Sequence, residues 1–355
     1  MKKILALTLA IVLCLGVFVG CQPKEVWEQT VFSFGENQTA YKYYGRVGQS
    51  EKGVEVAWPA SGVEFTLKCS GDVILNYSAS TEGYLQICID GVETQRPYFR
   101  TGVKSITVAE GLEQGEHTIR ILQESDVSTG GGYTIFKDLE FVGVKNSVKP
   151  TAEKELFIEF VGDSITSGKG VLQEGGGYQA IDPCHSPTHA YAVRTAEALD
   201  ADWSLVSRGG CGYFRVTSCP HTANEIYPYL NRFARNPVEY TFPRKADIVV
   251  IALGTNDGKE LASEEEMRNA MKQLISQVRA AHGEATPVVL LYGMMATNWS
   301  DQFMEVATEL ENVYSLRVPR NNEGGNNHPN EAAMIVTAEK LTAFLLELVI
   351  PTLQK

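Results

Sequence analysis

The feature that most constrains the fold is the alternation of short apolar runs with helical patterns in the second half of the chain. The apolar runs, which predict strands, cover residues 156–161, 203–206, 247–253, 287–293 and 313–317. The predicted helices cover residues 189–200, 263–281, 301–310 and 330–348. Strands that are apolar throughout and lie between helices are typical of a parallel sheet buried on both faces. We therefore expect a three-layer α/β/α domain over residues 156–355.

The first half of the chain has a different pattern, in which no helical period is found. Residues 63–67 alternate apolar and polar side chains, and residues 84–89 do so less strictly before the hairpin signal Asp90-Gly91. Residues 115–122 predict a further strand. This pattern favours a β-sandwich of the jelly-roll type over residues 30–145.

The length and charge of the chain limit the number of domains and the kinds of partner that can be expected. A chain of 355 residues is too long for one ordinary core, so two domains are expected. Residues 146–155 contain Asn, Ser, Pro and Lys and are predicted to link the domains, whereas residues 22–29 are predicted to be a tether. The net charge of −12, without a basic patch, argues against nucleic acid as a partner but does not select a substrate.

The N-terminus has the pattern of a targeting segment. Lys2-Lys3 precede an apolar run over residues 4–19, which is short for a membrane span but typical of a signal peptide. Phe18-Val19-Gly20-Cys21 resembles the bacterial lipobox, in which the Cys is lipidated and becomes the mature N-terminus. Residues 1–21 are therefore expected to be a lipoprotein signal peptide, with a lipid anchor on Cys21 and the protein facing outside the cytoplasm in the bacterial cell envelope. The alternative is plain secretion with Cys21 free.

Outside the cytoplasm, cysteines can form disulfides. The cysteines that follow residue 21 are Cys69, Cys88, Cys184, Cys211 and Cys219. Their number is odd, so at least one thiol stays unpaired within the chain. Cys69 and Cys88 could pair in the first domain, and Cys219 could pair with Cys184 or Cys211. Their spacing matches no zinc site.

The first candidate for chemistry is Ser164. The apolar run of residues 157–161 ends at Gly162-Asp163-Ser164, and ligands of open parallel sheets bind beyond the carboxyl ends of strands. Ser164 is thus either a nucleophile displayed at the sheet edge or a residue of an ordinary turn. The tripeptide alone favours the turn, because Gly, Asp and Ser are common turn residues.

Two further polar motifs follow strands. Leu253-Gly254-Thr255-Asn256-Asp257 either caps a helix or presents the Asn256 amide to a developing oxyanion. The glycine-rich turn over residues 207–212 is either flexible or allows the Gly210 N–H to face the same oxyanion. It is not a phosphate-binding loop, because no Lys-Ser/Thr pair follows.

Among the six histidines, His328 is the best candidate for a base. It lies in Asn326-Asn327-His328-Pro329-Asn330, just before the last predicted helix. His117 belongs to a predicted sandwich strand, and His282 lies near a helix C-terminus, where a cation is favourable. Other histidines fall in loops near the expected cleft as possible substrate contacts, namely His185, His189 and His221.

Together these four segments resemble the SGNH (GDSL-type) hydrolases, whose conserved blocks supply Ser, Gly, Asn and His in this chain order. The matching residues are Ser164, Gly210, Asn256 and His328. Within that group the chain is similar to carbohydrate esterase family 2, through residues 189–192 and 201–203, the glycine-rich turn, the GTND motif and the HPN ending. That family places a β-sandwich before an SGNH domain, so the resemblance covers nearly the whole mature chain.

The resemblance implies O-deacetylation of a carbohydrate, with a xylan- or mannan-like polysaccharide as the expected substrate. Ser164 would attack the acetyl carbonyl after His328 removes its proton. The N–H groups of Ser164 and Gly210 and the side chain of Asn256 would form the oxyanion hole. No metal or organic cofactor is implied.

The sequence departs from the SGNH pattern at one position. Many of these hydrolases have an Asp three residues before the His, where this chain has Gly325. Members of the resembling family often use a Ser-His dyad with a backbone carbonyl in its place, and we expect the same here. The side chains of Asn326 and Glu323 are rivals for that role.

Several other residues are expected to support the site. Asp163 is predicted to be a structural acceptor under the nucleophile turn, and Asp257 is predicted to organise its own turn. Candidate substrate contacts are His189 and the aromatic residues Trp299, Tyr213, Phe214 and Tyr178. For the aromatic residues the alternative is plain loop packing.

The sequence leaves two other functions open. One is a short-chain esterase or lipase, which no long apolar lid segment supports. The other is a glycan-binding lipoprotein whose catalytic domain has decayed. The sandwich is expected either to shape one wall of the cleft or to bind glycan.

Overall fold

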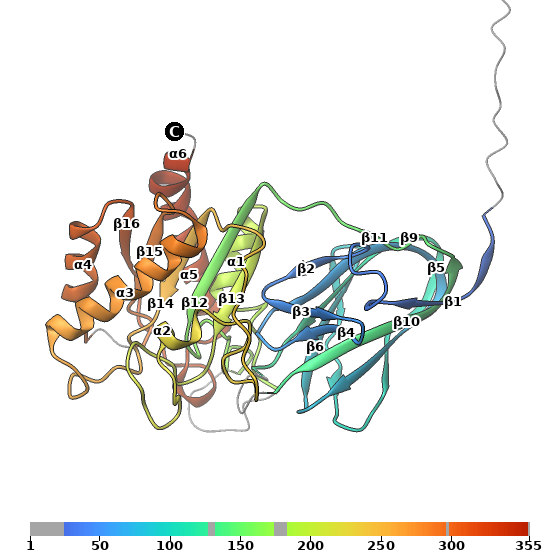
Figure 1. The fold of residues 1–355 in the computed structure, drawn as a ribbon, viewed down its shortest axis with the longest axis horizontal. Coiled ribbons are helices and arrows are strands. Elements are labelled where there is room, and N and C mark those ends of the chain that lie inside the picture. The colour runs from blue at the N-terminus through green and yellow to red at the C-terminus, as the bar shows by residue number, and fades with distance from the viewer. Residues whose placement is uncertain (1–24, 127–131, 174–182, 296–297, 354–355) are drawn as a thin grey trace, which may run out of the picture.

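The computed structural model describes residues 25–126, 132–173, 183–295 and 298–353. Figure 1 shows two domains side by side, a β domain formed by the first half of the chain and an α/β domain formed by the second. Within the described residues, no helix combines the length and the apolar character that a membrane crossing requires.

The N-terminal domain is antiparallel throughout. Its strands are β1 (Trp27–Ser33), β2 (Lys42–Tyr44), β3 (Val47–Ser50), β4 (Gly53–Val56), β5 (Gly62–Ala79), β6 (Gly83–Ile89), β7 (Val92–Gln95), β8 (Tyr98–Phe99), β9 (Ser105–Gln123), β10 (Thr134–Val144) and β11 (Lys149–Pro150). The main strand order is β3-β4-β10-β5-β9-β6-β7. The long strands β5 and β9 change register near Gly71, and such bulges let a strand bend. Buried residues from most of these strands join one core, so the sheet curves around it as predicted for a jelly-roll-like fold.

Two boundaries of this domain differ from those expected. Strand β1 begins at Trp27, within the predicted tether, because it pairs with β10 along its whole length. Within the predicted linker, Lys149 and Pro150 form β11 and pair with Thr66 and Phe65 of β5. Both segments lack a strong apolar alternation, so the pairing partner rather than the local sequence makes them strands.

The C-terminal domain is the predicted α/β/α sandwich. Its parallel strands are β12 (Leu156–Gly162), β13 (Ala201–Ser207), β14 (Ile248–Ala252), β15 (Val288–Tyr292) and β16 (Val313–Arg317). Its helices are α1 (Tyr191–Ala198), α2 (Ala223–Ile226), α3 (Glu264–His282), α4 (Ser300–Glu309), the 3-10 turn η2 (Gly325–Asn327), α5 (Glu331–Phe344), the π-helical turn η3 (Leu345–Val349) and α6 (Ile350–Leu353). Helices α1 and α5 share a core with one face of the sheet, and α2, α3 and α4 share a core with the other.

The strand order brings the polar motifs together. The sheet runs β13-β12-β14-β15-β16, so the chain leaves β12 toward one side and returns to its other side. Ligands of open α/β sheets bind at such a switch point, beyond the carboxyl ends of the strands. Gly162 at the end of β12 pairs with Ser207 of β13 and Ala252 of β14. The segments that follow these three strands therefore start at one edge of the sheet.

A buried ion pair joins the two domains. Arg46, which follows β2, is 1 % exposed, and its Nη2 lies 3.2 Å from Oε1 of Glu159 in β12. The same guanidinium donates to the carbonyl oxygens of Tyr227 and Tyr229. The Trp58 indole N–H also donates across the interface, to the Leu230 carbonyl. The domains thus share a buried polar interface.

The structure shows which cysteines pair, a question that the sequence left open. Cys211 and Cys219 form a disulfide, whereas Cys69, Cys88 and Cys184 are free thiols. The possible pairing of Cys69 with Cys88 does not form, because β9 lies between β5 and β6. Strands two places apart are separated by about 10 Å, beyond the reach of a disulfide.

Candidate active site

Ser164 occupies the turn that follows β12. The Asp163 carboxylate accepts from the Ile165 N–H at 2.9 Å, and the Lys169 N–H donates to the Ser164 carbonyl at 2.9 Å. These bonds coil the chain just after the strand and fix the direction of the Ser164 side chain. Ser164 Oγ lies 2.8 Å from Nε2 of His328, so the two side chains are in hydrogen-bond contact.

The loop before α5 orients His328. Asn326 and Asn327 both have left-handed backbone angles, with φ of 54° and 57°, which Asn tolerates better than most residues. This bend turns the Asn326 carbonyl toward His328, whose Nδ1 lies 2.9 Å from that oxygen. A carbonyl only accepts, so Nδ1 carries the proton and Nε2 is left to accept from the Ser164 hydroxyl.

Neither side-chain rival orients the imidazole. Glu323 Oε2 accepts from the side chains of Asn321 and Asn330, at 3.2 and 3.4 Å. Asn326 contacts His328 through its backbone carbonyl. Burial lowers the pKa of His328, the hydrogen bond to Asn326 opposes this effect, and the nearby Lys169 cation lowers the pKa further. The net effect lowers the pKa of His328 and favours the neutral imidazole, the form that a base requires.

The glycine-rich turn lies beside Ser164. The Arg208 N–H donates to the Gly162 carbonyl and the Cys211 N–H to the Arg208 carbonyl, at 3.3 and 3.2 Å. Gly210 has a φ of 79°, and a Cβ there would lie 2.3 Å from the Ser218 hydroxyl oxygen, so only glycine fits. In the described part of the chain, the N–H groups of Ser164 and Gly210 have no hydrogen-bond acceptor.

The Asn256 side chain links the turn after β12 to the glycine-rich turn. Its Nδ2 donates to the Cys211 carbonyl at 2.8 Å and to Asp163 Oδ2 at a longer 3.3 Å. Burial raises the pKa of Asp163 to about 7, and the nearby carboxylate of Asp257 adds to this effect. The buried Asp163 carboxylate thus accepts hydrogen bonds from both the Ile165 N–H and the Asn256 side chain.

Asp257 braces a different turn from the one expected. Its two carboxylate oxygens accept from the backbone N–H groups of Tyr213 and Phe214, at 3.1 and 2.8 Å. The side chain thus holds the exit of the glycine-rich turn, not its own turn. The sequence could not indicate this, because the partners lie more than forty residues away.

A pocket of about 530 Å³ opens above the Ser164–His328 pair. It is lined by Asp126, Ser164, Ser167, Lys169, His185, Arg208, Gly209, Gly210, Ser218, Thr255, Asn256, Met295, Asn326 and His328. Only one of these residues, Met295, is apolar. The pocket therefore includes Ser164, Gly210, Asn256 and His328 from the predicted site, together with His185 from the loop histidines.

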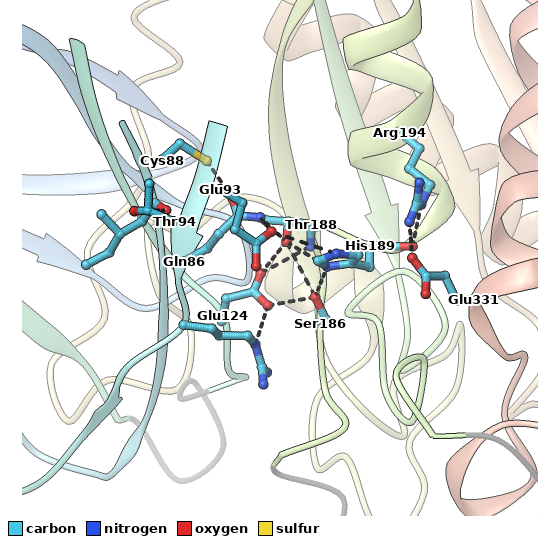
Figure 2. A network of polar contacts seen from close by, with 12 residues as sticks. Gln86, Cys88, Glu93, Thr94, Glu124, Ser186, Thr188, His189, Arg194 and Glu331 are labelled. Atoms are coloured by element: carbon cyan, nitrogen blue, oxygen red, sulfur yellow. Dashed lines mark hydrogen bonds and ion pairs between the residues drawn. The ribbon is translucent and has the colours of Figure 1, made fainter. Parts of the chain in front are cut away.

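The structure places the predicted stacking residues elsewhere. Trp299 is 1 % exposed and donates to the Asp257 carbonyl, and Tyr213 is 2 % exposed, so both belong to the core under the sheet. Phe214 packs against the same core. His189 bonds Ser186 in a network between the domains (Figure 2). None of the four lines the pocket. Tyr178 and Cys21 lie outside the described residues.

Sequence reasoning missed several pocket residues. Lys169 and Arg208 flank predicted motifs, and the proximity of Lys169 to Ser164 in sequence was a usable signal. Asp126 is different, since it follows β9 in the N-terminal domain, and no motif surrounds it. Only the docking of the two domains brings Asp126 to the pocket.

Comparison with protein families divides the chain in the same way. Residues 160–333 match the GDSL-like Lipase/Acylhydrolase family, and residues 43–150 match the Carbohydrate esterase 2 N-terminal family. A search of curated proteins finds no significant match.

Solved structures of low sequence identity share the fold. A family two carbohydrate esterase from Cellvibrio japonicus aligns with a TM-score of 0.81 and 16 % identity, over 93 % of this chain and 100 % of that one. An acetyl xylan esterase, Est2A, from Butyrivibrio proteoclasticus gives 0.79 and 20 %, over 89 % and 98 %. A family two carbohydrate esterase from Clostridium thermocellum, in complex with cellohexaose, gives 0.76 and 23 %, over 86 % and 98 %.

The parallel sheet and the family match over residues 160–333 define a GDSL-type hydrolase. The N-terminal domain narrows this class further. With a Carbohydrate esterase 2 N-terminal domain followed by a GDSL-like hydrolase domain, the chain is a carbohydrate esterase, and it shares its fold with the family two enzymes.

Proposed function

We propose that this protein is a serine esterase that removes O-acetyl groups from a xylan- or mannan-like polysaccharide. The observation on which the proposal depends is the 2.8 Å contact between Ser164 Oγ and His328 Nε2 inside a polar pocket. A serine hydroxyl that donates to a neutral imidazole is an activated nucleophile. Ser164 and His328 are therefore the catalytic pair of the proposed reaction.

The reaction has two steps. Ser164 Oγ attacks the acetyl carbonyl carbon while His328 takes the hydroxyl proton, and the tetrahedral intermediate collapses to an acetyl-enzyme. His328 gives that proton to the departing sugar oxygen. A water molecule, deprotonated by His328, then attacks the acetyl carbon, so that acetate leaves and Ser164 regains its proton.

The oxyanion of each step is stabilised by backbone donors. The N–H groups of Ser164 and Gly210 have no acceptor within the described structure and lie beside the nucleophile. Asn256 is the third donor. It would turn toward the oxyanion the hydrogen that now makes the long contact with Asp163. The loss of one such donor typically lowers kcat by about 10²–10³-fold.

The pocket supports a sugar ester over a lipid ester. Its lining is polar except for Met295, which suits sugar hydroxyls and a short acyl group better than a long acyl chain. A similar structure is described as an acetyl xylan esterase and another is described in complex with cellohexaose, which supports a β-linked polysaccharide. A membrane anchor through Cys21 in the bacterial cell envelope remains part of the proposal, on the lipobox-like sequence alone.

The test is acetate release from acetylated xylan, acetylated mannan and a simple aryl acetate. We expect Ser164→Ala and His328→Ala to lower the rate by about 10⁴-fold or more. The matched control is Ser105→Ala, which removes an exposed serine hydroxyl of β9 and should leave the rate unchanged. Release from the aryl ester without release from either glycan would favour a short-chain esterase. Glycan binding without any release would favour a decayed, glycan-binding protein.

A further inference from the structure

We propose that Asp126, which the N-terminal domain contributes, is a positioning residue for the hydrolase site. Its carboxylate holds the Gly209–Gly210 turn in the orientation that directs the Gly210 N–H at the reacting carbonyl oxygen. This inference rests on the proposed esterase function and adds to it a role for the second domain.

The contact is direct. The Gly209 N–H donates to Asp126 Oδ2 at 3.1 Å. A Cβ built on Gly209 would lie 3.8 Å from the Ser164 Cβ and 3.9 Å from Asp126 Oδ2, so this residue lies close to both the carboxylate and the nucleophile. Among the described residues that line the pocket, Asp126 alone comes from the N-terminal domain.

The hydrogen bonds of the turn explain why an outside contact matters. Arg208 and Cys211 donate their N–H groups within the hydrolase domain, and Gly209 donates to Asp126, which leaves the Gly210 N–H for substrate. Two successive glycines adopt many backbone angles at similar energy, so the sequence of the turn does not itself fix the direction of this N–H. The Asp126 carboxylate restrains the first glycine, and the Cys211–Cys219 disulfide restrains the residue after the second.

The segment that precedes Asp126 is held by a network that spans the domains. Two residues before it, Glu124 is 0 % exposed and accepts from Ser186 Oγ at 2.6 Å and Thr188 Oγ1 at 2.7 Å (Figure 2). Arg96 Nε donates to the same carboxylate at 2.9 Å. Burial raises the pKa of Glu124, and the Arg96 charge and the two hydroxyl donors oppose that effect. The segment before Asp126 is thus fixed to both domains.

A competing role for Asp126 is electrostatic. The carboxylate lies near two basic residues of the pocket, Arg208 and His185; burial lowers the pKa of each, and the Asp126 charge opposes that effect. The two roles predict different results for Asp126→Asn. The amide oxygen of Asn can still accept from Gly209, but the charge is gone.

The experiment compares Asp126→Ala and Asp126→Asn with the wild type. Steady-state kinetics are measured on an aryl acetate and an acetylated xylo-oligosaccharide, together with the affinity of a small alkylboronic acid, which forms a tetrahedral adduct on an active serine. We expect Asp126→Ala to lower kcat by about 10–10²-fold on both substrates with little change in KM, because a small displacement of a catalytic donor has effects of this size. The boronic acid affinity should fall in parallel, and Asp126→Asn should recover most of both losses.

The matched control is Asp72→Ala. The Asp72 carboxylate also accepts a backbone N–H, that of Gly111 at 2.9 Å, but it lies at an exposed position of the sandwich. This variant should retain the wild-type kcat. Thermal melting of each variant separates loss of fold from loss of positioning, and a melting temperature near the wild type is expected for Asp126→Asn.

Three results would overturn the proposal. The first is an unchanged kcat in Asp126→Ala. The second is a rise in KM of Asp126→Ala for the glycan alone, which would make Asp126 a sugar contact. The third is an Asp126→Asn variant as impaired as Asp126→Ala, which would make the charge of Asp126 the important property. Failure of the proposed esterase function gives a different result, because the wild type would then release acetate no faster than Ser164→Ala.

Discussion

At the scale of single residues, the site depends on a backbone carbonyl in the place where many serine hydrolases have a carboxylate. The Asn326 carbonyl accepts from His328 Nδ1 at 2.9 Å and fixes the tautomer without adding a negative charge. The Lys169 cation acts on His328 and disfavours the imidazolium. His328, the proposed base, therefore stays neutral to lower pH than an ordinary histidine.

This arrangement predicts a pH dependence that Lys169 controls. In the proposed mechanism His328 takes the Ser164 proton only when neutral, so kcat/KM should fall as the pH drops through the pKa of His328. Removal of the cation in Lys169→Met raises that pKa, so the acidic limb of the kcat/KM profile should move to higher pH. Lys169→Arg keeps the charge and is the matched control. A limb that stays in place or moves to lower pH in Lys169→Met would contradict this account.

At the scale of elements, short loops at the carboxyl ends of the strands supply the chemistry, and their backbone conformations matter as much as their side chains. The turn η2 is an example, because two left-handed Asn residues bend the chain so that a carbonyl meets His328. The Gly325 N–H donates to the Gly170 carbonyl at 2.8 Å, which docks this turn on the segment after Ser164. The geometry of the proposed catalytic pair thus depends on the contact between these two loops.

Substitutions at Asn326 separate the backbone from the side chain. Asn326→Gly keeps the left-handed angle and the carbonyl, so its activity should stay within a few-fold of the wild type. Asn326→Val disfavours that angle, displaces the carbonyl and should lower kcat by about 10²-fold or more. Both variants are measured by acetate release at a pH where His328 is neutral. If Asn326→Gly were as inactive as His328→Ala, the Asn326 side chain would be the group that matters.

At the scale of the whole molecule, the two domains act as one unit because buried charges join them. Burial opposes the ionisation of Glu159, but the Arg46 charge and the His282 contact outweigh it and hold the pKa of Glu159 well below its usual range. The Arg46 guanidinium also lies over the rings of Tyr227 and Tyr240, each 4.8 Å from the ring centroid. Neither charge could be exposed without separating the domains.

Removal of one partner of this pair should destabilise the whole chain. Arg46→Met keeps much of the side-chain volume but leaves Glu159 buried without its main partner, so the free energy of unfolding should fall by about 3–5 kcal/mol. Urea denaturation measures the change. The control is Arg268→Met, which breaks an exposed ion pair with Glu305 and should change the free energy by less than about 1 kcal/mol. A loss in Arg46→Met as small as in the control would show that the ion pair does not hold the domains.

Features that depend on local sequence could be predicted, whereas features that depend on contacts between distant segments could not. The strands of the α/β domain could be predicted because their apolar runs are local, and the motifs at their ends could be predicted because parallel strands end at one edge. That a backbone carbonyl orients His328 could be inferred only from resemblance, and the structure was needed to identify it as the carbonyl of Asn326. The contact of Asp126 with the pocket and the position of His189 in the interdomain network depend on how the two domains pack together. No local sequence pattern predicts that packing.

The measurement that tests the central claim most directly is the site of the acyl intermediate. The enzyme is mixed with an aryl acetate, quenched in acid during the first turnovers and digested, and the peptides are analysed by mass spectrometry. We predict an acetyl group on the peptide that contains Ser164 in the wild type and none on any peptide of Ser164→Ala. An acetyl group on another residue, or acetate release by Ser164→Ala at the wild-type rate, would contradict the proposed mechanism.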